Sequence, residues 1–170
     1  MSVFSNLIDQ DATIISLQNA VAASKDESTK SQAMTHAWLF TGPPGSGRSN
    51  AALAFAAALV CEMGGCGSCN TCKSALAGVH GDVEIVKTEG LSIKIDEIRE
   101  LITRAAWAPS VGLYRVVVIE DADRLTESAA NALLKAIEEP GERTVWLLCA
   151  PTATDVLPTI RSLNAHKGYS

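Results

Sequence analysis

Four cysteines lie within twelve residues and have the spacing of a metal site. They are Cys61, Cys66, Cys69 and Cys72. Repeated C-x2-C spacing in an intracellular protein is typical of zinc, and four thiolates complete a closed tetrahedral shell with a structural role. Glycines in the same stretch let the backbone wrap an ion: Gly64, Gly65 and Gly67. The alternative is that Cys61 ends an apolar helix as a small hydrophobe and the other three are incidental.

A glycine-rich segment precedes these cysteines. It reads Gly42-Pro43-Pro44-Gly45-Ser46-Gly47-Arg48-Ser49. The pattern G-x-x-x-x-G-[basic]-[ST] between an apolar run and a helix is typical of a loop that binds nucleotide phosphates through backbone amides. Ser49 would then hold Mg²⁺ beside ATP, whereas Arg48 replaces the usual Lys and has a different shape. The alternative is a glycine-rich turn without a ligand.

Two carboxylates follow the most hydrophobic run, Val116–Ile119. They are Glu120 and Asp121. In ATPases with a phosphate-binding loop, an Asp at this position coordinates Mg²⁺ and a Glu after it often activates water. The order here is reversed, so we expect Glu120 to crowd the metal and Asp121 to fall short of the water. A solvated strand end is the alternative, and no residue is predicted to be catalytic.

Hydrophobic periodicity predicts the elements that position these residues. The expected helices span residues 11–23, 49–60, 95–106 and 126–138. The expected strands span residues 37–41, 83–87, 116–119 and 144–149, with Cys149 buried in the last. Because continuous apolar strands alternate with helices, the sequence predicts an α/β fold: a three-layer sandwich around a parallel sheet.

Length and charge limit the possible functions. The chain has 170 residues, enough for one domain, and a net charge of −5. An acidic domain lacks the accumulated Lys and Arg that give strong non-specific DNA binding, so DNA contact would need partners or a local patch. The longest apolar run, Ala51–Cys61, is too short to cross a bilayer. We expect no membrane association and a cytoplasmic location, since the N-terminus does not resemble a signal peptide.

Three motifs in order resemble one family. Thr35–Ser49 is similar to the phosphate-binding region of bacterial DNA polymerase III clamp-loader subunits, and the four-cysteine insert is similar to their zinc module. Ala130–Pro140 resembles their N-A-L-L-K-x-[IL]-E-E-P signature, which is the most specific of the three. The resemblance implies an AAA+ nucleotide-binding domain over residues 1–162, with a zinc module inserted at about residues 61–80.

Departures within this family favour its stator subunit, which does not hydrolyse ATP. The hydrolysing gamma/tau subunits carry Lys at position 48, an Asp-Glu pair at 120–121, and a polar γ-phosphate sensor where this chain has Ala150-Pro151. The resemblance implies gamma/tau and delta subunits as partners, with the sliding clamp contacted indirectly and primed DNA bound only within the complex. The alternative is a gamma/tau-type motor or another AAA+ ATPase that hydrolyses ATP.

The last residues depart from the family pattern. The family's arginine finger lies in a Ser-Arg-Cys motif, but Leu163-Asn164 follow Ser162 here, and Arg161 lies two positions too early. We therefore expect residues 163–170 to be a foreign or truncated end, and the isolated piece to be monomeric. The three histidines show no ligand spacing, and we expect them to be structural or solvated: His36, His80 and His166.

Overall fold

The computed structural model describes residues 37–41, 48–87, 90–105, 114–138, 144–151 and 165–168. The helix predicted at residues 11–23 lies outside these ranges. The strands are β1 (Ala37–Thr41), β2 (Val83–Val86), β3 (Arg115–Ile119), β4 (Thr144–Ala150) and β5 (Ala165–Gly168). The helices are α2 (Arg48–Val60), α3 (Asn70–Leu76), α4 (Ile95–Ala105), the 3-10 turn η2 (Ala122–Arg124) and α5 (Glu127–Glu138).

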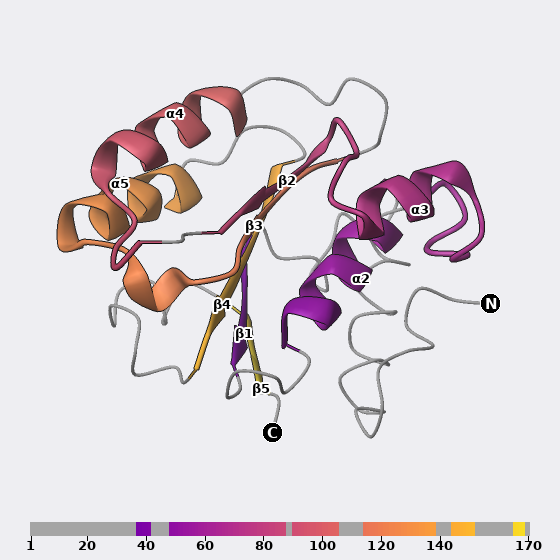
Figure 1. Cartoon of the computed structure of the whole chain (residues 1–170), viewed down its shortest axis with the longest axis horizontal. Helices are drawn as coiled ribbons and strands as arrows, with labels where there is room; N and C mark the ends of the chain where they lie inside the picture. The colour runs from indigo at the N-terminus through magenta and orange to yellow at the C-terminus, as the bar shows by residue number, and fades with distance from the viewer. Residues whose placement is uncertain are drawn as a thin grey trace.

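The strands form one sheet in the order β2-β3-β4-β1-β5, and every neighbouring pair is parallel. Helices α2 and α3 cover one face, and α4 and α5 cover the other (Figure 1). The predicted three-layer α/β sandwich is therefore confirmed. Among the described residues, no helix is long and apolar enough to cross a membrane.

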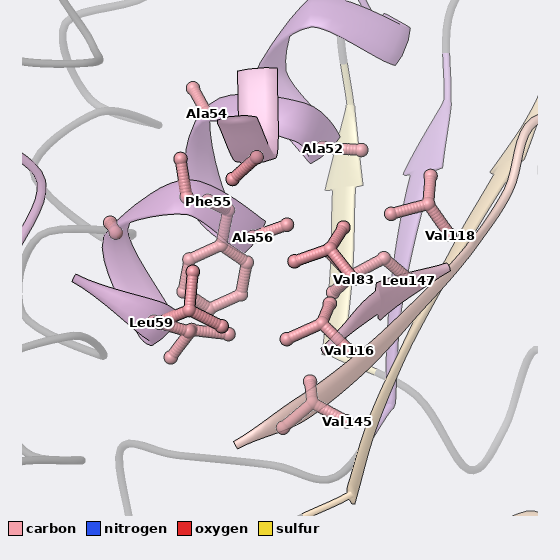
Figure 2. Close-up of a cluster of buried hydrophobic side chains, with 14 of the residues drawn as sticks. Ala52, Ala54, Phe55, Ala56, Leu59, Val83, Val116, Val118, Val145 and Leu147 are labelled. Atoms are coloured by element: carbon pink, nitrogen blue, oxygen red, sulfur yellow. The ribbon is translucent and has the colours of Figure 1, made fainter. Parts of the chain in front are cut away.

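Side chains of the central strands alternate between two cores because a strand has a period of two residues. Every residue of β3 and β4 is buried. The core facing α2 includes Phe40, Val116, Val118, Val145 and Leu147, several of which appear in Figure 2. The core facing α4 and α5 includes Leu39, Val117, Ile119, Trp146 and Leu148.

Helix α2 is buried on nearly all sides, which explains why it is apolar around its whole circumference. It packs on the sheet and is covered by α3 on another side (Figure 1). Alanines let it approach the strands closely, and Phe55 supplies the bulk, with its ring edge-on to Trp38 at a centroid distance of 5.0 Å. The prediction began this helix at Ser49, one residue after its start at Arg48.

Three described elements were not predicted. The seven-residue α3 lacks an apolar period and begins where the Cys69 side chain caps it. The turn η2 has only three residues. The strand β5 has the sequence AHKG, which carries no strand pattern, and it joins the sheet by pairing with β1 from Trp38↔Ala165 to Thr41↔Gly168. The foreign origin expected for residues 163–170 stays a prediction.

Enlarging an alanine on the buried side of α2 should destabilise the domain. Ala56 is completely buried in the core of Figure 2. We expect Ala56→Leu to lower the free energy of unfolding by about 1–3 kcal/mol, because extra methylenes in a packed core force strain. Urea denaturation measures the change. The control, Asn50→Leu at an exposed position of the same helix, should stay within about 0.5 kcal/mol of the wild type. Equal losses in the two variants would contradict this packing.

Candidate metal centre and nucleotide-binding edge

The carboxyl ends of the parallel strands meet at one edge of the sheet. There β1 ends at Thr41, β3 at Ile119 and β4 at Ala150. Six residues predicted to bind phosphate lie outside the described residues: Gly42, Pro43, Pro44, Gly45, Ser46 and Gly47. Arg48 is the first residue of α2, and Ser49 lies half-buried in its first turn. The phosphate-binding role of this segment therefore stays a prediction.

The strand register places Glu120 at the same edge. Ile119 pairs with Leu148, and the Glu120 backbone N–H donates to the Val86 carbonyl at 3.0 Å, so the ladder continues for one more residue. Glu120 therefore lies in the row of Cys149 and Phe40, which pair with each other. Alternation along β3 directs its side chain to the face that α2 covers. This is the side on which the predicted phosphate-binding segment enters its helix.

The two carboxylates at the end of β3 have different surroundings. The Glu120 side chain is only 11% exposed, and its Oε2 lies 3.4 Å from Nζ of Lys87. Asp121 precedes η2, where its carbonyl oxygen accepts the Arg124 N–H at 2.9 Å and its side chain makes no capping hydrogen bond. Glu120 is thus already paired with a cation, whereas Asp121 lies in a turn.

Sequence reasoning missed Lys87. Its charge was not linked to Glu120 because the two residues are far apart in the chain. Only the pairing of β2 with β3, in which Val86 lies opposite Ile119, brings them together. A signal for such a pair does exist in the sequence. One strand is followed directly by a charged residue, and the next strand is followed directly by a residue of opposite charge. If the two strands are parallel neighbours, these two residues lie side by side.

The four cysteines form one compact cluster, and their sulfur atoms all lie within 4.8 Å of one another. The Sγ atoms of Cys61 and Cys69 are 3.7 Å apart, and those of Cys66 and Cys72 are 4.0 Å apart. A tetrahedral zinc with bonds of about 2.3 Å places its sulfur ligands roughly 3.8 Å apart. The cluster could therefore hold a metal ion in a closed four-sulfur shell.

Local backbone geometry assembles this cluster. Cys61 follows α2 directly, and its N–H still donates to the Ala57 carbonyl at 3.0 Å. The chain then reverses at three glycines with positive φ, a conformation that side-chain-bearing residues rarely adopt. Their φ values are 75° at Gly64, 101° at Gly65 and 81° at Gly67. The backbone-wrapping role predicted for these glycines agrees with this geometry.

Helix α3 supplies the other side of the cluster. Cys69 is its N-cap, and the Cys72 N–H donates to the Cys69 sulfur at 3.4 Å. The Gly67 N–H donates to the Cys72 sulfur at 3.3 Å. These donors favour thiolates, which are the form that binds metal. Cys61 and Cys72 are buried and Cys66 and Cys69 are half-buried, so the cluster is partly withdrawn from solvent.

The pKa values of two cysteines in the cluster are shifted in opposite directions. Backbone N–H groups of Ser68 and Cys69 lower the pKa of the Cys66 thiol to about 6. Burial raises the pKa of the Cys72 thiol to about 12. Four thiolates this close would repel one another, and a divalent cation at their centre would offset that repulsion.

His80 lies in the turn before β2, and the structural or solvated role expected for it stays a prediction. Its Nδ1 accepts the Asp82 N–H at 3.0 Å, and its carbonyl accepts the Val83 N–H at 3.2 Å. Among the described residues, the metal-capable cluster contains only the four cysteines. His36 lies outside the described residues, and His166 lies in β5.

Comparison with known proteins gives a consistent family. A family model described as "DNA polymerase III, delta subunit" matches residues 17–165. The DNA polymerase III subunit delta' of Pseudomonas aeruginosa is 38% identical over 75% of this chain and 40% of its own length. The subunit gamma/tau of Mycobacterium tuberculosis is 37% identical over 78% of this chain and 24% of its own length. This chain therefore spans less than half of either relative.

Solved structures agree on the fold. A DNA polymerase III gamma subunit-related protein from Thermotoga maritima has a TM-score of 0.66 at 24% identity, over 95% of this chain and 46% of its own. A RuvB mutant from the same organism has a TM-score of 0.65 at 16% identity, over 99% of this chain and 48% of its own. These likenesses confirm the AAA+ type of sandwich. The family match over residues 17–165 and the identity to the delta' relative show that this chain belongs to the DNA polymerase III delta-subunit family.

Proposed function

We propose that this chain is a delta-prime-type stator subunit of the DNA polymerase III clamp loader. It would act in the cytoplasm with gamma/tau and delta subunits, support loading of the sliding clamp onto primed DNA, and hydrolyse little or no ATP. The observation that carries the proposal is the end of β3, where Glu120 replaces the expected Asp and is already paired with Lys87 at 3.4 Å. Family membership and the delta' relatives support the assembly in which it would act.

The groups needed for ATP hydrolysis are altered at three places on this edge. Glu120 is one methylene longer than Asp, so its carboxylate extends further from β3, and Asp121 follows in a turn. Arg48 carries a planar guanidinium where a compact ammonium is usual. Beside them β4 ends at buried Ala150, and half-buried Pro151 follows it, so neither residue offers a polar side chain to a γ-phosphate. A bound nucleotide would therefore be held without the groups that align and activate water.

A second candidate is a gamma/tau-type motor that hydrolyses ATP. The observation that favours it is the 37% identity to the Mycobacterium tuberculosis gamma/tau subunit, close to that of the delta' relatives. The rate of ATP turnover distinguishes the stator from the motor.

We also propose that the metal of the cysteine cluster is Zn²⁺ and that its role is structural. Zn²⁺ prefers tetrahedral thiolate shells, and four sulfur ligands leave no position open for water. The cluster joins the end of α2 to the start of α3, so its chemistry would be to hold these two elements together.

One zinc ion per chain should be found in protein purified without chelator. We expect Cys69→Ala to abolish stoichiometric zinc and to lower the thermal stability of the domain, because metal binding to the folded cluster contributes folding free energy. Elemental analysis and thermal denaturation measure these effects. The control is Cys149→Ala, which removes a buried cysteine of β4 outside the cluster and should retain one zinc. Well under one zinc per wild-type chain would contradict the assignment.

ATP turnover by the wild-type chain should stay far below about 1 s⁻¹, the lower end for a working phosphoryl-transfer enzyme. The triple variant Arg48→Lys, Glu120→Asp, Asp121→Glu should remain below this rate as well, because Ala150 and Pro151 still provide no sensor. Phosphate release measured at saturating ATP tests both proteins. Wild-type turnover at or above that rate would contradict the stator proposal and favour the gamma/tau-type motor.

The 170-residue chain should be monomeric, with a mass near 17.9 kDa. Among the described residues, the exposed large hydrophobic side chains are Met63, Leu76, Val79 and Leu91, and they include no Trp, Tyr or Phe. With a net charge of −5, it should bind DNA negligibly at physiological salt. Light scattering after size-exclusion chromatography and a DNA titration measure these properties. A ring-sized oligomer or tight DNA binding would contradict the proposal.

A further inference from the structure

The parallel pairing of β2 with β3 brings Lys87 and Glu120 into contact. Val86 and Ile119 are partners in the β2–β3 ladder, and Glu120 N–H donates to the Val86 carbonyl at 3.0 Å. Lys87 and Glu120 are therefore neighbours in the next row. The Nζ–Oε2 distance of 3.4 Å is a consequence of backbone register rather than of a chance surface encounter.

The two partners are unequally exposed. Glu120 is 11% exposed and Lys87 is 73% exposed, so the carboxylate is the group that needs compensation. A carboxylate withdrawn from water is stabilised by a nearby cation. Lys87 supplies that cation from the chain itself, and it approaches from β2, on the opposite side of β3 from β4 and β1.

A magnesium ion would compete for the same oxygen. Mg²⁺ binds oxygen ligands, commonly one or two carboxylates together with waters and phosphates. Of the two carboxylates here, Glu120 is paired with an ammonium, and Asp121 lies beyond the end of β3, in the turn before η2. The residues at the end of β3 therefore do not fit a dedicated Mg²⁺ site.

We propose that Lys87 takes the place of the divalent cation at Glu120, so that this edge binds the phosphates of a nucleoside di- or triphosphate independently of Mg²⁺. The inference rests on the proposed function, because it assumes a nucleotide held without hydrolysis. It adds that Lys87 is a positioning residue, since it acts on the nucleotide through Glu120. An ion pair with one exposed partner is worth a modest factor, so the expected effect on Mg²⁺ dependence is about two- to fivefold.

The test compares the affinity of the zinc-loaded chain for fluorescent mant-ADP with and without millimolar Mg²⁺. We expect Mg²⁺ to change the wild-type Kd by less than about twofold. In Lys87→Met, Mg²⁺ should tighten binding about two- to fivefold, because Glu120 is then free to bind the metal. Electron paramagnetic resonance of Mn²⁺ gives a second readout, with more nucleotide-dependent Mn²⁺ bound by the variant than by the wild type.

The matched control is Lys135→Met, which removes the same charge from an exposed position of α5 on the other face of the sheet. It should leave the Mg²⁺ dependence at the wild-type value, and melting temperatures verify that both variants are folded. The inference is overturned if Mg²⁺ tightens wild-type binding about twofold or more, if both variants respond alike, or if no mant-ADP binds. Fast ATP turnover by the wild type would instead contradict the proposed stator function. Failure of this inference and failure of the proposed function therefore give different results.

Discussion

Burial of β3 and β4 on both faces is the constraint on which the other features depend. Every residue of these two strands is buried, so helices must cover the sheet on both sides. Because all strands run parallel, their polar ends are forced to one edge. That arrangement brings the carboxylate of Glu120 and the ammonium of Lys87 together at the edge where β1 leads toward α2.

The cysteine cluster and the end of β3 each gather groups that carry or can carry negative charge, and the compensating cation differs between them. At the cysteine cluster, backbone N–H groups and φ-positive glycines gather sulfur atoms that an external cation could join. At the end of β3, the chain provides its own cation, Lys87. The cysteine cluster is suited to bind a metal ion. At the end of β3, Lys87 already compensates the charge of Glu120, so a metal ion is less needed there.

Long apolar segments were predictable from the sequence, and short polar ones were not. The four strands found by periodicity begin and end within about a residue of their positions in the structure, because continuous Val, Ile and Leu runs have few alternatives. The cysteine cluster was predictable from spacing alone. Helix α3, turn η2 and strand β5 were missed because capping and backbone pairing define them rather than hydrophobic pattern. The contact of Lys87 with Glu120 required knowing that β2 lies beside β3.

The length of α2 has a consequence of its own. The helix runs without a break from Arg48 to Val60, with Cys61 directly after it, so helical phase fixes the orientation of Cys61 relative to Ser49. Inserting or deleting one residue would rotate one end by about 100° against the other and shift it by about 1.5 Å. Cys61 would then point away from its three partner sulfurs. Over Ser49–Cys61 the chain can therefore exchange side chains of similar size far more easily than it can change length.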